Sequence, residues 1–195
     1  MVGRPREFDP EIVLNAAMQA FWAKGYEATS LSDLMAATGL HKGSLYQAFG
    51  DKHSLFIQAL KRYLSDMRRM KSEVIAGAST PLDGIKAVAH GMLDMADGDC
   101  SCPRGCLAIN TLVELAPHDP EVQDVMSDHM QRMRKALTEA VALGQEAGQI
   151  RTDRSPEKVT ALMMTFMLGL GTNLRGRLSK EDAHDLLDAQ FEAVI

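Results

Sequence analysis

Three cysteines lie close together near the middle of the 195-residue chain, at Cys100, Cys102 and Cys106, with Arg104 between the last two. The thiolate is the reactive form of cysteine, and a helix N-terminus or a nearby cation stabilises it. An apolar, helix-like segment begins at Leu107, so Cys106 stands at a predicted helix start beside Arg104. This pattern favours a reactive, sensing thiol at Cys106, and its neighbours Cys100 and Cys102 could resolve it after oxidation or modification.

Two other interpretations of the cysteines stay open. Thiolates bind zinc or copper(I), but three ligands at this spacing differ from the common structural zinc patterns. A fourth ligand would have to come from elsewhere, for instance His90 or His118. Alternatively, Cys106 is a small apolar packing residue and the other two belong to a loop. We expect neither a metal ion nor another cofactor in this protein.

The remaining reactive side chains form no catalytic pattern. The six histidines are scattered, and neither a Ser/His/Asp set, a pair of carboxylates nor a glycine-rich phosphate loop occurs at a useful spacing. Methionines are numerous in the C-terminal half, where they could line an adaptable ligand pocket or simply fill a core. We therefore expect a protein that is not an enzyme, and reversible binding of a small molecule remains an alternative to thiol chemistry.

Two short helices joined by a tight turn are predicted in the N-terminal quarter of the chain. Ser30, with an acidic residue three positions later, is typical of the capped start of a helix over about residues 31–37. Gly39 can adopt the positive φ of a sharp helix exit, and a second helix is predicted at residues 42–49. This spacing is that of a helix-turn-helix unit.

The second of these helices has a polar outer face suited to a DNA major groove. Its apolar residues Leu45 and Phe49 are expected to point to the core, which leaves Lys42, Ser44, Tyr46 and Gln47 facing outward. Lys52, at the start of the next helix, is placed for a phosphate contact. Arg4 and Arg6 belong to an N-terminal arm that could reach into a minor groove, although a solvated terminus is equally consistent with the pattern.

Residues 25–30 (GYEATS), 38–46 (TGLHKGSLY) and 49–52 (FGDK) together resemble the DNA-binding domain of TetR-family repressors. The resemblance covers about residues 4–60. It implies a homodimer that binds a near-palindromic double-stranded operator, and it adds Thr29 and Gly43 to the DNA-contacting residues. The segment from Gly105 to Asn110 is similar to that of TetR-family members that respond to electrophiles and oxidants through a cysteine, which implies such an effector for Cys106.

Charge is distributed unevenly along the chain. The net charge is −5, but residues 1–71 hold ten Lys and Arg against seven Asp and Glu, whereas residues 72–195 hold eleven against nineteen. The small positive charge therefore lies with the helix-turn-helix, which permits DNA binding through one end. The odd number of cysteines, the absence of an apolar signal segment and the lack of a membrane-length apolar run predict a cytoplasmic protein without a membrane partner.

The remaining two thirds of the chain also have helical patterns. We expect an all-α protein with a DNA-binding domain over residues 1–51, formed by three helices, and a helical ligand-sensing and dimerisation domain over residues 52–195. The run from Val159 to Leu170 is apolar on nearly all faces, so it should be covered on more than one side. The predicted dimer interface consists of Met163, Phe166, Met167, Leu170, Leu186, Leu187 and Phe191.

The sequence thus predicts a DNA-binding transcriptional regulator. In this hypothesis it is a repressor that a small molecule, or modification of a cysteine, releases from its operator. The alternative is a helical ligand-binding or interaction module in which the helix-turn-helix serves packing only. A gel-shift experiment with upstream DNA separates these two hypotheses.

Overall fold

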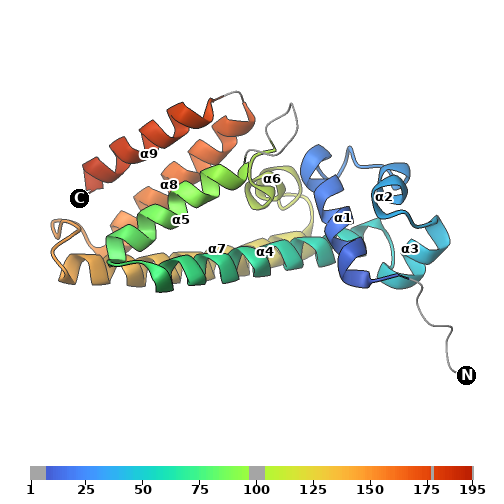
Figure 1. The fold of residues 1–195 in the computed structure, drawn as a ribbon, viewed down its shortest axis with the longest axis horizontal. Coiled ribbons are helices and arrows are strands. Elements are labelled where there is room, and N and C mark those ends of the chain that lie inside the picture. Colours follow the sequence, from blue (N-terminus) through green and yellow to red (C-terminus); the bar gives the residue numbers. More distant parts are fainter. Residues whose placement is uncertain (1–7, 97–103, 177, 195) are drawn as a thin grey trace, which may run out of the picture. The chain divides into compact units, whose positions relative to one another are not determined.

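The computed structural model describes residues 8–96, 104–176 and 178–194, and within these ranges the chain forms helices and no strand (Figure 1). The prediction of an all-α protein is confirmed. The helix predicted over about residues 31–37 spans Leu31–Thr38, and the helix predicted at residues 42–49 spans Lys42–Phe49. The helices are α1 (Pro10–Lys24), α2 (Leu31–Thr38), α3 (Lys42–Phe49), α4 (Lys52–Gly77), α5 (Pro81–Ala96), α6 (Leu107–Glu114), α7 (Pro120–Glu146), α8 (Pro156–Arg175) and α9 (Lys180–Val194).

The chain divides into two compact units, Met1–Ser65 and Asp66–Ile195. Helix α4 begins in the first unit and ends in the second. This division differs from the boundary expected after residue 51, because the first part of α4 buries Leu55, Phe56 and Leu60 in the core of the first unit.

Aromatic side chains form the centre of the first unit. Phe21 of α1 meets Phe56 of α4 edge to face with ring centroids 5.1 Å apart, and Tyr26 contacts the same Phe56 ring at 4.9 Å. Trp22 and Tyr63 form a second edge-to-face pair between the same two helices. Such pairs are each worth about 0.5–1.5 kcal/mol beyond the area that they bury. They fix α1 against α4, and this pair supports the two short helices α2 and α3.

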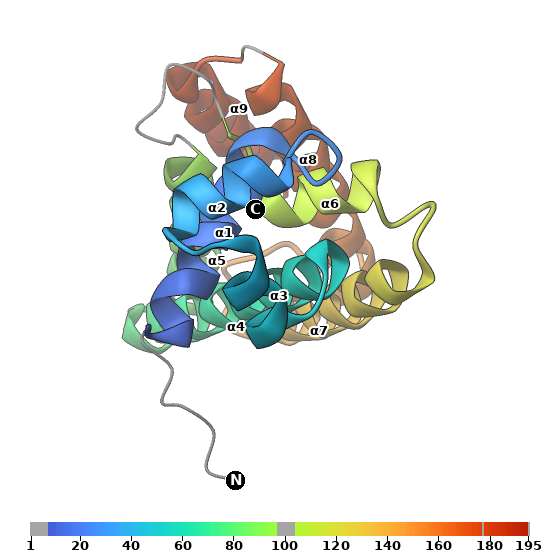
Figure 2. The ribbon, with the colours of Figure 1, turned by 90° about the vertical axis from the view of Figure 1, so that its right-hand side faces the viewer.

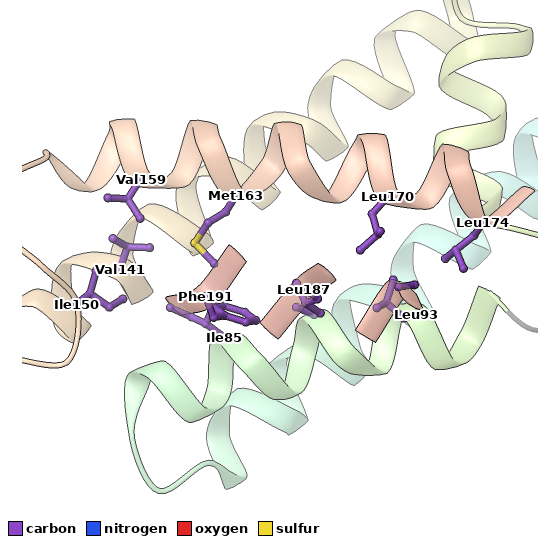
Figure 3. Packing of buried hydrophobic residues seen from close by; sticks show 12 residues of the cluster. Ile85, Leu93, Val141, Ile150, Val159, Met163, Leu170, Leu174, Leu187 and Phe191 are labelled. Carbon is purple, nitrogen blue, oxygen red and sulfur yellow. The ribbon is translucent and has the colours of Figure 1, made fainter. Parts of the chain in front are cut away.

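Helices α5, α7, α8 and α9 enclose the core of the second unit (Figure 3). Ile85 and Leu93 of α5 face Leu187 and Phe191 of α9, and Met163 of α8 lies with them. The apolar run in α8 is thus covered on several sides by the chain's own helices. In the described parts of the chain, each helix is too short or too polar to cross a membrane.

Candidate nucleic-acid interface and sensor site

The turn between α2 and α3 is built as the residues predict (Figure 2). The Ser30 hydroxyl accepts a hydrogen bond from the Asp33 N–H at 3.2 Å, and Asp33 Oδ2 accepts from the Ser30 N–H at 2.8 Å, which completes a capping box. Helix α2 ends at Gly39, whose φ of 70° lies in the left-handed region that glycine adopts without strain. The chain can therefore reverse and begin α3 after a short connection.

Contacts from both flanking helices hold the helix-turn-helix in place. Lys24 Nζ of α1 lies 2.5 Å from Asp33 Oδ1 of α2, and this ammonium, with Ser30, holds the pKa of the Asp33 carboxyl well below its usual range. On the other side, Gln58 of α4 donates from Nε2 to the Phe49 carbonyl oxygen at 3.1 Å, so it satisfies a carbonyl at the end of α3. Helix α3 is thus anchored at its last residue and through buried Leu45.

The outer face of α3 is open to solvent. Lys42, Gly43, Ser44 and Gln47 are exposed, and Tyr46 is half-buried with Lys42 Nζ 5.7 Å from its ring centroid. A Cβ atom added to Gly43 would meet nothing within 4 Å. The exposure expected from the sequence is present. Because Gly43 has no side chain, another molecule can come close to the helix backbone at this position.

Thr29 requires a correction. Its side chain is fully buried, and its hydroxyl donates to the Gly25 carbonyl oxygen at 2.5 Å. The hydroxyl is therefore engaged inside the first unit, where it fixes the loop before α2, and it has no surface to offer to DNA. The resemblance to a family motif could not distinguish a buried loop residue from a contact residue.

The remaining predicted DNA-contacting residues are Lys52, Arg4 and Arg6. Lys52 is half-buried at the first position of α4, with its Nζ 4.4 Å from the centroid of the Tyr26 ring. The preceding Asp51 caps α4 by accepting a hydrogen bond from the Ser54 N–H at 2.7 Å. Arg4 and Arg6 lie outside the described residues.

The predicted helix start at Cys106 is confirmed. Cys106 is the residue before α6, and its carbonyl oxygen accepts from the Asn110 N–H at 2.9 Å. The Asn110 side chain is almost completely buried and donates to the Arg104 carbonyl oxygen at 2.8 Å. Gly105, which lies between Arg104 and Cys106, has a φ of 62°, a conformation that would be strained for a residue with a side chain. The buried amide therefore fixes the half-buried Cys106 thiol at the N-terminus of α6. Cys100 and Cys102 lie outside the described residues.

The structure adds a basic group to this thiol that the sequence did not reveal. Burial lowers the pKa of Lys71 in α4, and the electrostatic interaction with the Cys106 thiolate opposes this effect. Lys71 Nζ also lies 3.7 Å from Met133 Sδ of α7. One turn earlier on α7, burial, followed by the charges of Lys71 and Arg68, lowers the pKa of His129 to about 4. The Lys71 side chain thus interacts electrostatically with both Cys106 and His129.

Metal binding finds no support in the described residues: over 8–96, 104–176 and 178–194, no three His, Cys, Asp or Glu side chains are arranged to hold an ion. His90, named as a candidate fourth ligand, has both ring nitrogens engaged with other side chains. His118 is exposed in the turn between α6 and α7.

The predicted dimer interface also requires a correction. Four of its seven residues, Met163, Leu170, Leu187 and Phe191, are buried in the core of the chain itself. Phe166 and Met167 are partly buried against that core, and Leu186 is exposed. Helical periodicity identifies an apolar face but does not identify which helix covers it, and α5 and α7 cover this one.

A smaller apolar surface remains on α8 and α9. Leu162 and Leu186 are 43% and 46% exposed, which is high for leucine. A shallow pocket beside them is lined by Lys158, Ala161, Leu162, Thr165, Phe166 and Gln190. We call Leu162, Phe166 and Leu186, with the lining of this pocket, the α8–α9 face.

Family models match both parts of the chain. Residues 13–59 match the model of bacterial regulatory proteins of the tetR family. Residues 81–187, more than half of the chain, match the model of the tetracyclin repressor-like C-terminal domain. The two matches therefore include the helix-turn-helix and most of the second unit.

Several known proteins are similar to this chain over most of its length. The HTH-type transcriptional repressor ComR of Escherichia coli is 29% identical over 92% of this chain and 85% of its own length. The repressor DhaR of a Mycobacterium species is 27% identical over 91% and 87%. The structure of the TetR family transcriptional regulator CifR, with three cysteines substituted and bound to 26-bp double-strand operator DNA, is 29% identical and superposes with a TM-score of 0.85 over 99% of this chain and 100% of its own. The chain belongs to the TetR family of transcription regulators, which are not enzymes.

Proposed function

We propose that this protein is a repressor that binds a near-palindromic double-stranded DNA operator as a homodimer. An effector bound by the second unit, or modification of Cys106, releases it. The observation that carries the proposal is helix α3, which is anchored through Leu45 and Phe49 and exposes Lys42, Ser44 and Gln47 on its opposite face. In functional terms, residues 1–51 read DNA and residues 52–195 sense and dimerise.

The polar groups on α3 have different roles in this proposal. Gln47 and Tyr46 read base edges, and Lys42 and Lys52 contact phosphates, which position the protein but carry no sequence information. Exposed Gly43 lets the helix backbone approach the duplex. Arg4 and Arg6 add minor-groove contacts. The operator complex of CifR and the repressor names of ComR and DhaR support this assignment.

Dimerisation uses the α8–α9 face. Leucines that are nearly half exposed and adjoin an apolar pocket are typical of a surface that a second subunit covers. A two-fold axis through this face relates two α3 helices, which then address half-sites about 34–36 Å, or a multiple of that distance, apart.

The switch combines the Cys106 thiol with Lys71. Cys106 lies at the N-terminus of α6 and interacts electrostatically with Lys71, and an electrophile or oxidant reacts at this residue in the proposal. Lys71 belongs to α4, the helix that both units share. A chemical change at the thiol can therefore alter the position of α4. A tenfold loss of operator affinity needs only about 1.4 kcal/mol of differential stabilisation.

Footprinting on the DNA upstream of the protein's own gene tests the DNA-binding proposal. We expect two protected half-sites related by a two-fold axis. A chain that protects no DNA at salt concentrations near 0.1 M, while it folds and dimerises, would favour the alternative of a helical interaction module.

The sensor is tested by release of bound DNA with a thiol-reactive electrophile or with hypochlorite. Cys106→Ser should stay bound, and Lys71→Met should retain the thiol but react several-fold more slowly because the ammonium is lost. Release of Cys106→Ser as readily as the parent would instead favour a reversible small-molecule effector.

A further inference from the structure

Two histidines face each other between α5 and α9, apart from the Cys106 site. His90 Nδ1 and His184 Nδ1 are 2.6 Å apart, and the ring planes differ by 4°. Each ring has its other nitrogen beside a carboxylate: His90 Nε2 lies 3.0 Å from Asp188 Oδ1, and His184 Nε2 lies 3.3 Å from Asp94 Oδ1. The four side chains thus form one continuous line of polar contacts that joins the two helices.

The number of protons in this line follows from its geometry. A neutral imidazole carries one N–H and one acceptor nitrogen. Two neutral rings therefore supply two protons for three contacts, each of which needs one. If both Nε2 atoms donate to their carboxylates, two Nδ1 lone pairs oppose each other at 2.6 Å. If one Nδ1 carries the proton instead, one Nε2 lone pair faces a carboxylate oxygen. A third proton satisfies all three contacts.

We propose that His90 and His184 share one additional proton and so form a pH-sensitive clamp between α5 and α9. A tetrahedral zinc ion does not explain the pair, because two nitrogens about 2 Å from such an ion lie about 3.3 Å apart, whereas these two are 2.6 Å apart, a hydrogen-bonding distance.

The surrounding charges fit a protonated pair. Asp94 and Asp188 face the two rings, and Lys180 Nζ lies 2.9 Å from Asp94 Oδ1. The hydrogen bond from Lys180, followed by that from His184, holds the pKa of Asp94 below its usual range, so Asp94 is ionised at neutral pH. Two carboxylates, one ammonium and one shared proton give a neutral cluster, and loss of that proton leaves a net negative charge.

The other groups around the clamp are mostly apolar. Phe191 of α9 lies against the His90 ring, with centroids 6.4 Å apart, and Lys86 of α5 places its Nζ 5.6 Å from the centroid of that phenylalanine. Helices α7 and α8 complete the packing around α5 and α9 with core side chains such as Val141 and Leu170. Both histidine side chains remain about a quarter exposed, at 27% and 24%, so the clamp can exchange its proton with solvent.

Loss of the shared proton removes one charge-assisted contact from α9. The helix should then open more often while its buried residues Ala183, Leu187 and Phe191 keep it folded. Because α9 also carries Leu186, dimer affinity should become pH-dependent in the same direction. This last step alone rests on the proposed dimer, whereas the clamp exists within one chain.

The test is nitrogen NMR of the histidine rings combined with amide hydrogen exchange, both on the full chain. At neutral pH we expect protons on Nε2 of both His90 and His184 and a shared proton between the Nδ1 atoms. After correction for intrinsic rates, α9 amides should exchange several-fold faster at about pH 9 than at about pH 6, relative to α1 amides. His184→Gln should remove this pH dependence, and His118→Gln, at an exposed histidine outside the clamp, should keep it.

Either of two results overturns the clamp. One is a neutral pair at pH 7 with an unprotonated Nε2, and the other is a pH dependence of α9 exchange that survives in His184→Gln. If His184→Gln does not fold, His90→Gln supplies the same comparison, since it removes the other ring of the pair. An unchanged dimer affinity together with pH-dependent α9 exchange would reject the proposed role of α9 in dimerisation and leave the clamp intact.

Discussion

Gly43 separates the contribution of a residue to folding from its contribution to binding. It lies inside helix α3, where glycine is less favourable than alanine by up to about 1 kcal/mol, and an added Cβ would touch nothing in the chain. Gly43→Ala should therefore leave the unfolding free energy unchanged or raise it. If the α3 backbone approaches the duplex, the same methyl group should weaken operator binding. Urea denaturation and fluorescence anisotropy measure the two effects, and equal operator affinity of variant and parent would contradict a close approach at this position.

His129 makes a prediction about pH. Its pKa in the folded chain is about 4, below the ordinary 6.5, because burial and the charges of Lys71 and Arg68 disfavour the imidazolium. The unfolded chain therefore binds the proton more readily, so the stability that depends on neutral His129 is present above pH 6.5 and is lost as the pH falls from 6.5 towards 4.

The variant His129→Gln should lose less unfolding free energy than the parent between about pH 7 and about pH 4.5, measured by urea denaturation. His118→Gln is the matched control, because His118 is exposed and its replacement should leave the parent's acid sensitivity in place. Identical losses in His129→Gln and parent would show that His129 is not held neutral by its surroundings.

Single residues were the hardest features to predict from the sequence. The exposure of Lys42 and Gln47 could be predicted from helical spacing, because the apolar and the polar positions that define the pattern all lie on one short helix. Thr29 was misassigned because nothing in its neighbours indicates that its hydroxyl turns inward to the Gly25 carbonyl. Lys71 had no sequence signal at all, because its interactions with Cys106 and Met133 join residues that lie far apart along the chain.

At the scale of elements, local chemistry determined the helix boundaries. Asp9, Asp119 and Ser155 each cap a helix and are each followed by proline, which tolerates the first helical position because its missing N–H is not needed there. These signals involve neighbours in the sequence, so they could be read without the fold. The helices that pack against α8 and α9 could not be predicted from the sequence, because a pattern of apolar residues does not identify the helix that covers them.

Adjacent leucines on α9 distinguish the chain's core from the proposed dimer surface. Leu187 is buried at 2% exposure, so Leu187→Ala should cost about 2–5 kcal/mol of unfolding free energy. Leu186 is exposed, so Leu186→Glu should change the stability of a single chain by less than about 0.5 kcal/mol while it weakens the dimer. Analytical ultracentrifugation at micromolar concentration compares the two variants. A Leu186→Glu protein that remains as dimeric as the parent would exclude the α8–α9 face.

At the scale of the whole molecule, the division into a DNA-reading part and a sensing part stays a prediction from the sequence, and family models match residues 13–59 and 81–187. Helix α4 belongs to both compact units, so it offers a continuous route between the Lys71 region and the residues that support α3. Coupling between operator and effector is reciprocal, so an effector that weakens DNA binding must itself bind the DNA-bound protein less tightly by the same factor.

The most direct test of operator recognition by α3 is the DNA affinity of a double variant that changes only its exposed face. Lys42→Ala with Gln47→Ala removes the proposed phosphate contact and the proposed base contact, and neither side chain is buried. Lys135→Ala with Gln131→Ala is the control, because it makes the same chemical change on the exposed surface of α7.

Fluorescence anisotropy on the footprinted operator, at one fixed salt concentration, should show a loss of about 10- to 100-fold for the α3 variant, since a good base contact contributes about 1–3 kcal/mol. The control should bind like the parent, and circular dichroism should show both variants fully helical. Equal operator affinity of the α3 variant and the control would contradict recognition through α3.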